Sequence, residues 1–171
     1  KYQRTDGSVD VERLRAAARI YITAQEILVD NAGYPSESIA RNSHQFRPLG
    51  LGFANIGALL MSMGLPYDSD EGRAVAGAIM AIEHSEAYAR SAEIAANNRI
   101  GPFEEYATNE APMLDVMRMH RNAVHNIDRD DCPDYLLEAA HESAERMVAL
   151  GERHGYRNAQ ATVLAPTGTI G

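Results

Sequence analysis

The last residues of the chain combine residue types that bind anions. Five of them form a turn directly after the one β-rich run in the second half of the sequence: Pro166, Thr167, Gly168, Thr169 and Ile170. A strand that stops at such a turn usually leads into a helix, whose free N–H groups and positive dipole end attract an anion together with the threonine hydroxyls. Gly168 would let the backbone come close to that ligand. The turn lacks the lysine and the spacing of a P-loop, so a strand-ending turn with Thr167 or Thr169 as a helix cap stays open as the alternative.

Histidines and glutamates on the helices offer weaker candidates for chemistry. Glu138 and His141 share a helix face at the Glu-x-x-His spacing of di-iron bundles, but such sites need a second copy of the motif and two further glutamates, which we do not find. A solvated helix face is therefore the better interpretation. His120 and His125 are five residues apart and diverge around their helix, so ordinary surface or half-buried histidines are expected there.

Cys132 is the single cysteine, and it lies in an acidic loop over residues 128–134. The negative charge of that loop would raise the pKa of the thiol and discourage a nucleophilic thiolate, so a small buried or boundary residue is expected. Glu83 and His84 are adjacent on a helix and therefore point in two directions.

Composition narrows the class of protein. Of the 171 residues 45% are hydrophobic and 23% are charged, as in a globular domain or a piece of one. The net charge of -8 argues against a nucleic-acid surface. One cysteine excludes an internal disulfide and fits a reducing cytoplasm, and no apolar run approaches the ~18 residues of a membrane span. Since the chain opens on Lys1 and ends at the turn, we expect a fragment of a longer protein.

Periodicity predicts about five helices and one or two short strands. The helices cover residues 10–29, 55–63, 68–97, a stretch from 109 that includes 124, and 133–154, with a further short helix over 36–44. The strands are expected at 49–53 and 162–164, and because two isolated strands cannot form a stable sheet, they would need partners from missing sequence.

Some details of these elements can be tested directly. In the first helix Tyr21 and Leu28 are expected on the buried face, and in the helix from 109 Val116 is expected inward, with Pro112 in the first turn. Gly50-Leu51-Gly52 indicates close backbone packing rather than a nucleotide fingerprint, because the full glycine pattern is missing.

Five blocks of sequence together resemble the large catalytic chain of the adenosylcobalamin-dependent, class II ribonucleotide reductases. The blocks are residues 24–32, 47–52, 64–70, 154–160 and 164–170, in order along nearly all 171 residues. Residues 81–85 match the family less well. The resemblance implies a mostly α fragment, residues 1–171, of a ten-stranded α/β barrel that is truncated at both ends.

The resemblance also implies chemistry: ribonucleotides are reduced to deoxyribonucleotides by a thiyl radical generated from adenosylcobalamin. The family's radical cysteine and reducing cysteine pair cannot be placed here, so the chain alone is expected to be inactive, with no catalytic residue and no metal ligand of its own. The turn from Pro166 to Ile170 matches the family's substrate-diphosphate turn residue for residue.

Expected partners are a ribonucleoside di- or triphosphate, deoxynucleotide effectors, a thioredoxin-type reductant and a second copy in a homodimer, with no nucleic acid and no membrane. A non-catalytic helical scaffold is the alternative. The reductase reading predicts a buried strand over residues 162–165 without neighbours and turn amides that face an open concavity. The scaffold reading predicts closed helix packing, with the last dozen residues loose on the surface.

Overall fold

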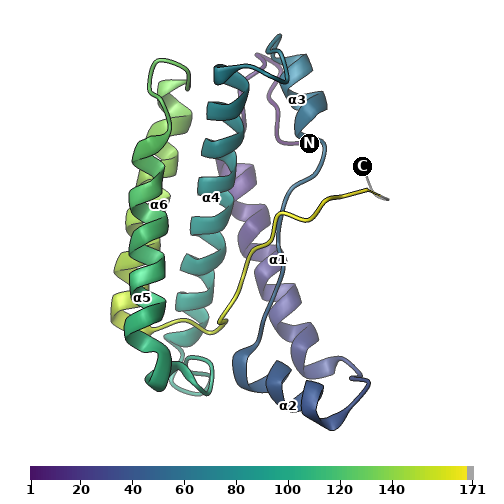
Figure 1. The fold of residues 1–171 in the computed structure, drawn as a ribbon, viewed down its shortest axis with the longest axis vertical. Coiled ribbons are helices and arrows are strands. Elements are labelled where there is room, and N and C mark those ends of the chain that lie inside the picture. The colour runs from purple at the N-terminus through teal and green to yellow at the C-terminus, as the bar shows by residue number, and fades with distance from the viewer. Residues whose placement is uncertain (169–171) are drawn as a thin grey trace.

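The protein is an assembly of helices in which one long helix occupies the centre (Figure 1). The computed structural model describes residues 1–168, and within them it contains six α-helices and one 3-10 turn. In chain order these are α1 (Val11–Asn31), α2 (Glu37–Phe46), α3 (Ile56–Ser62), α4 (Asp70–Ala95), α5 (Tyr106–Ala123), η1 (Val124–Asn126) and α6 (Asp134–His154). The predicted helical content is therefore confirmed. No helix in the described part of the chain is both long and apolar enough to cross a membrane.

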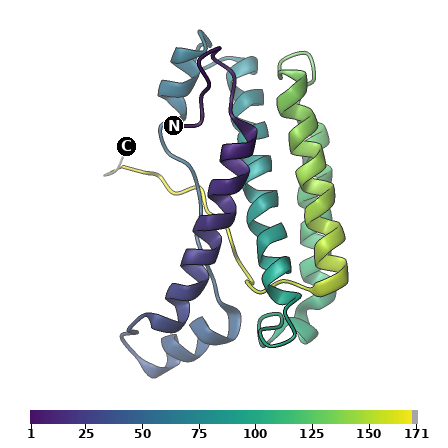
Figure 2. The ribbon, with the colours of Figure 1, turned by 180° about the vertical axis from the view of Figure 1, so that it is seen from behind.

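Helix α4 owes its central place to its composition. It runs for 26 residues, and many of its side chains are small: alanine, glycine or serine. Buried residues occur along nearly its whole length. Small side chains let neighbouring backbones approach closely, so α6 packs along one side of α4 and α1 along the other, with α5 outside against α6 (Figures 1 and 2). The Ser69 hydroxyl accepts a hydrogen bond from Gly72 N–H at the N-terminus of α4, as its sequence predicts.

The buried face of α1 differs from the prediction. Leu14 and Ala18 of the expected face are buried, but Tyr21 and Leu28 are 55% and 61% exposed, so from Ile22 onward the buried face is turned by one residue. That face carries Leu14, Ala18, Ile22, Glu26 and Val29. The physical reason is Glu26, whose carboxylate is buried because arginines from distant segments pair with it.

Helix α5 begins earlier than predicted. It starts at Tyr106, which is buried against other aromatic rings, so Pro112 lies inside the helix and not in its first turn. Proline has no N–H to donate within a helix, and Pro112 is on the exposed side. Val116 is 40% exposed, while Leu114 and Met117 are the buried residues of this helix.

The two predicted strands are not strands in the described chain, but the segments that contain them do meet. Leu51 and Thr162 form an isolated parallel bridge, and the extended segments around them run beside α4 in both views (Figures 1 and 2). Residues separated by more than a hundred positions are thus neighbours. Because only one bridge forms, the pair does not reach the length of a regular strand.

Candidate functional site

The chain that leads to the predicted anion turn is held against residues 49–51 by backbone hydrogen bonds. Leu49 N–H donates to Gln160 O at 2.7 Å, Leu51 N–H donates to Ala161 O at 3.0 Å, and Val163 N–H donates to Leu51 O at 2.8 Å. Two parallel segments are paired in this way over three hydrogen bonds. The pairing fixes the direction in which the chain runs toward the turn.

Beyond this pairing the chain is open to solvent. Val163 and Leu164 are 43% and 57% exposed, so the expected buried strand over 162–165 is wrong on two points: it has one neighbour, and its burial stops at Ala161, which is 0% exposed. No described residue covers the outer side of this stretch, which explains the exposure. Residues 160–163, the first part of the last dozen, are not loose either, because they are hydrogen bonded to residues 49–51.

The turn itself is only partly described. Pro166 and Gly168 are exposed and Thr167 is half-buried, with Thr167 at the left-handed φ of 54°. A Cβ added at Gly168 would meet nothing within 4 Å, so the backbone there is accessible. Thr169 and Ile170 lie outside the described residues. The anion site therefore stays a prediction.

A buried polar cluster, which we call the Glu26 node, anchors both paired segments. The Glu26 carboxylate accepts from Arg47 Nε at 2.5 Å, from Arg157 Nε at 2.7 Å and from Asn158 Nδ2 at 2.7 Å. Arg47 also makes a bidentate contact with Asp30 at 2.8 and 2.9 Å, and that hydrogen bonding lowers the pKa of the Asp30 carboxyl. Bidentate arginine contacts fix orientation as well as charge.

The Glu26 node lies where the two paired segments begin. Arg47 lies two residues before the segment that starts at Leu49, and Asn158 lies two residues before the segment that starts at Gln160. Asn158 is 0% exposed, donates to Arg47 O at 3.0 Å, and is locked to α4 because its side chain accepts from the Ser91 hydroxyl at 2.8 Å. The register of the two segments is thus set by side chains. Sequence reasoning missed this node because Glu26 lies 21 and 131 residues from its arginine partners.

A second set of contacts ties the same segment to α4 and α5. The Tyr88 hydroxyl accepts from Ala161 N–H at 3.1 Å. His84 Nδ1 lies 2.8 Å from Thr162 Oγ1, and His84 Nε2 lies 2.9 Å from His120 Nδ1. Burial, with His120 nearby, lowers the pKa of His84 to about 4, and burial also lowers the pKa of His120. Both rings are therefore neutral at pH 7, where each offers one donor and one acceptor.

The other residues that the sequence suggested for chemistry do not come together in one site. Glu138 is exposed, and His141 lies with its ring centroid 4.7 Å from that of His125. Cys132 is buried as predicted, and burial first and the Asp134 charge second raise the pKa of its thiol. Among residues 1–168 no group of three or more histidine, cysteine or acidic side chains could hold a metal ion. Glu83 points away from His84, as the helix geometry predicts, into a cavity beside α1.

The family model and the curated relatives that match this chain all point to the same family. The sequence model of a family described as "Ribonucleotide reductase, barrel domain" matches residues 1–171. Among curated proteins, the chain is 56% identical over 170 residues to a vitamin B12-dependent ribonucleotide reductase of Rhodopirellula baltica, covering 99% of this chain and 16% of that protein. It is 47% identical to the protein of the same name from Agrobacterium fabrum, covering 95% of this chain and 14% of that protein. For the Streptomyces clavuligerus protein of that name the identity is 48%, over 96% of this chain and 17% of the relative.

Proposed function

The chain belongs to the ribonucleotide reductase family by its barrel domain, and on this premise we propose that it is one part of an enzyme that reduces ribonucleotides to deoxyribonucleotides. The chain spans about a sixth of the length of the curated relatives that it matches. We propose that its own contribution is the turn from Pro166 to Ile170, which binds the phosphates of the nucleotide substrate.

One observation carries this proposal: the segment that ends in the turn is anchored by side chains before it becomes exposed. Tyr88, His84 and the Glu26 node all hydrogen bond within residues 158–162, and none of them has a hydrogen bond to residues 166–168, the part of the turn that the structure describes. A ligand site needs donors that are already in place, because ordering them on binding costs affinity. Thr167 and the accessible backbone at Gly168 would then be presented on a fixed support.

The chemistry of the turn suits phosphate. Threonine hydroxyls and backbone N–H groups are donors, and hydrogen bonds to an anionic oxygen are shorter and stronger than those between neutral groups. The turn has no cationic side chain, so recognition would rely on oriented dipoles, as at other phosphate sites built from the backbone. The net charge of -8 would not attract a nucleotide from a distance, which leaves affinity to short-range contacts.

We propose that the two paired segments belong to a ten-stranded α/β barrel, of which the rest is supplied by other parts of the polypeptide. Support comes from the parallel pairing of residues 49–51 with 160–163 and from the helices that cover one side of it. In such folds parallel strands are connected through helices, as these two are through α3 to α6.

The proposed cofactor is adenosylcobalamin, since the relatives are named vitamin B12-dependent. When bound, it supplies the radical that is passed to a cysteine thiol. The described residues do not fit this group: the cavity beside α1 has about 550 Å³, a volume for a drug-sized ligand, and cobalamin is larger. Cys132 is buried with a raised thiol pKa, so it is unsuited to thiol–disulfide exchange, which needs an accessible thiolate. We therefore assign no catalytic step to this chain and expect no turnover from it alone.

The rest of the proposal follows the family. The substrate is a ribonucleoside di- or triphosphate in the cytoplasm, with deoxynucleotide effectors, a thioredoxin-type reductant and a homodimer as further partners. The scaffold alternative is less well supported, because a segment that only covers a helical bundle does not need a buried, ion-paired anchor such as the Glu26 node where it begins.

The test uses the complete polypeptide that contains residues 1–171. Replacing Thr167 and Thr169 together by valine removes two hydroxyls while keeping side-chain shape. We expect nucleoside diphosphate to bind at least about 100-fold more weakly, because hydrogen bonds to charged groups contribute about 1.5–3 kcal/mol each and two are removed. Equilibrium binding by calorimetry measures this. The exposed Thr108→Val variant on α5 is the control and should bind as the parent does. Unchanged affinity in the double variant would remove the turn from the substrate site.

A further inference from the structure

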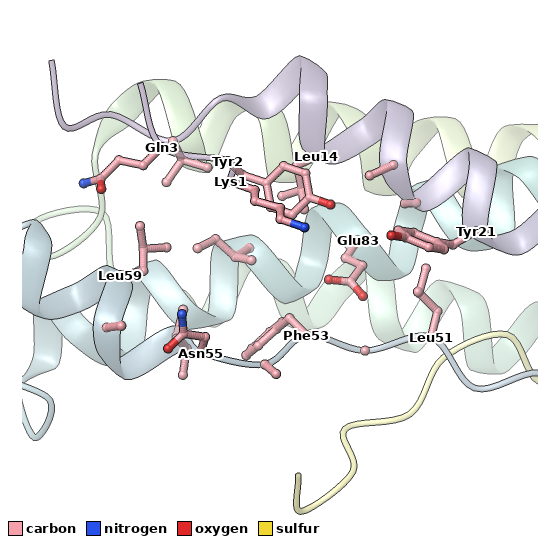
Figure 3. Close-up of a pocket in the computed structure, with 18 of the residues that line it drawn as sticks. Lys1, Tyr2, Gln3, Leu14, Tyr21, Leu51, Phe53, Asn55, Leu59 and Glu83 are labelled. Carbon is pink, nitrogen blue, oxygen red and sulfur yellow. The ribbon is translucent and has the colours of Figure 1, made fainter. Parts of the chain in front are cut away.

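A cavity separate from the turn lies between α1, the N-terminal residues and the chain that leads into α3. It has a volume of about 550 Å³, within the range of sites for small ligands. Its walls are mostly apolar and aromatic, with Leu14 from α1, Tyr2 from the N-terminal segment, and Phe53 and Leu59 on the opposite side. Figure 3 shows the Glu83 side chain reaching from α4 into this space.

Glu83 is buried without a partner. Its side chain belongs to a residue that is 4% exposed, and its Oε1 has no hydrogen-bond partner among the described residues. Burial raises the pKa of this carboxyl to about 7, the direction expected for a buried carboxyl without an ion-pair partner. A buried carboxylate without a partner is costly, so it calls for an explanation.

The other buried glutamates provide an internal comparison. Glu26 is held by two arginines and an asparagine, and Glu86 pairs with Arg146 at 2.9 Å and accepts from the Ser143 hydroxyl at 3.2 Å. This protein thus supplies donors to its other buried glutamates. Glu83 differs in one respect: it faces an open cavity instead of another element.

The groups around Glu83 define what the cavity can hold. The other polar groups that line it are neutral or cationic: Lys1, Gln3, Asn55, Ser62 and the hydroxyls of Tyr2 and Tyr21. Lys1 forms no ion pair with Glu83 within 4 Å in the described chain. An anionic ligand would be repelled by the carboxylate, and a purely apolar one would leave it unpaired. A cation satisfies Glu83 and also interacts favourably with the faces of aromatic rings.

We propose that this cavity is a binding site for a cationic nitrogen group, an ammonium or a guanidinium carried on an apolar body, with Glu83 as its counter-ion. The group can belong to a free small molecule or to a side chain from the polypeptide outside residues 1–171. Both sources share the same chemistry, and the site does not depend on the proposed substrate turn.

Benzamidine is a suitable probe because it is a planar cation with an apolar ring, and neutral benzamide has nearly the same shape. With the 171-residue chain, tyrosine fluorescence should report saturable binding of benzamidine and not of benzamide. Binding should be about tenfold tighter at pH 8 than at pH 6, because a carboxyl with a pKa near 7 is mostly ionised at the higher pH and mostly protonated at the lower. Glu83→Gln should lose at least about tenfold in affinity, equivalent to about 1.4 kcal/mol, and the exposed Glu138→Gln should lose none.

The same titration on the complete polypeptide separates the two sources. If benzamidine still binds, the natural occupant is a free ligand. If it does not bind, and Glu83→Gln lowers the melting temperature at pH 8, a cationic side chain of the polypeptide occupies the site. The proposal is overturned if benzamide binds as tightly as benzamidine, or if wild type and Glu83→Gln bind benzamidine equally. The pH dependence of the unmodified chain decides the matter even if Glu83→Gln does not fold. Thr167→Val should leave benzamidine binding unchanged, so a failure here is distinct from a failure of the substrate site.

Discussion

Burial disfavours the charged forms of two neighbouring residues, Glu83 and His84, although one is an acid and the other a base. Burial raises the pKa of Glu83 to about 7 and, with His120, lowers the pKa of His84 to about 4. Desolvation disfavours the charged form of either group, which moves the two pKa values in opposite directions. The two residues point in different directions from α4, one toward the cavity and one toward Thr162.

These shifts predict opposing effects of pH on stability. Glu83 has a folded pKa of about 7 against 4.5 for an unperturbed glutamate, so the folded state holds a proton that the unfolded state has lost, and its contribution to stability falls as pH rises from 4.5 to 7. His84 has a folded pKa of about 4 against 6.5, so its contribution rises with pH from 4 to 6.5. Each amounts to about 3 kcal/mol over its window, and in the parent the two largely cancel between pH 4.5 and 6.5.

Single substitutions should reveal how Glu83 and His84 each contribute to the pH dependence of the free energy of unfolding. Urea unfolding of Glu83→Gln across pH 4 to 7.5 should show the parent losing about 3 kcal/mol relative to the variant as pH rises to 7. His84→Asn should show the reverse, with the parent gaining a similar amount by pH 6.5. The exposed Glu138→Gln should track the parent throughout. Differences that do not vary with pH would mean that neither group is held neutral in the folded state.

At the scale of elements, the pairing of residues 49–51 with 160–163 depends on a glycine. A Cβ placed on Gly52 would lie 2.1 Å from the carbonyl oxygen of Val163, whereas a Cβ on Gly50 would meet only the end of the Val163 side chain, at 2.9 Å. Backbone cannot move away as a side-chain methyl can. Sequence reasoning predicted close packing at these glycines, and the geometry confirms it.

Gly52→Ala should therefore separate the two segments while Gly50→Ala should not. We expect Gly52→Ala to lower stability by about 1–3 kcal/mol, as overpacking does, and to weaken nucleotide binding in the complete polypeptide because the turn loses its support. Gly50→Ala should show a smaller change in both. Urea unfolding and calorimetry measure the two effects, and equal behaviour of the two variants would contradict a role for this close contact.

Local patterns predicted some elements well and others poorly, for identifiable reasons. Helices α4 and α6 agree with their predicted ranges closely, because a serine cap, an acidic first turn and a terminal glycine are all local features. The face of α1 and the start of α5 were wrong because distant partners decide them: arginines 47 and 157 bury Glu26, and aromatic rings bury Tyr106. The Glu26 node likewise could not be predicted from the sequence, since no local pattern links residues 26, 47, 91 and 158.

At the scale of the whole molecule, the helices cover one side of the paired segments and leave one edge free. Residues 49 and 51 donate their N–H groups to residues 160 and 161, and in a parallel pair the intervening N–H groups point the other way. The amides of Gly50 and Gly52 make no hydrogen bond among the described residues. An unpaired strand edge is a template for a further strand, which is what the proposed barrel requires.

Amide hydrogen exchange can test whether that edge is completed. In the 171-residue chain the amides of Gly50 and Gly52 should exchange rapidly, and those of Leu49 and Leu51 should be protected by the hydrogen bonds already present. In the complete polypeptide, pairing with another barrel strand should slow exchange at Gly50 and Gly52 by at least about 100-fold, while Leu49 and Leu51 change little. Mass spectrometry with single-residue fragmentation resolves these alternating positions. Rapid exchange at both glycines in the complete polypeptide would show that residues 49–53 form an outer edge, and the placement of this chain within a closed barrel would then be wrong.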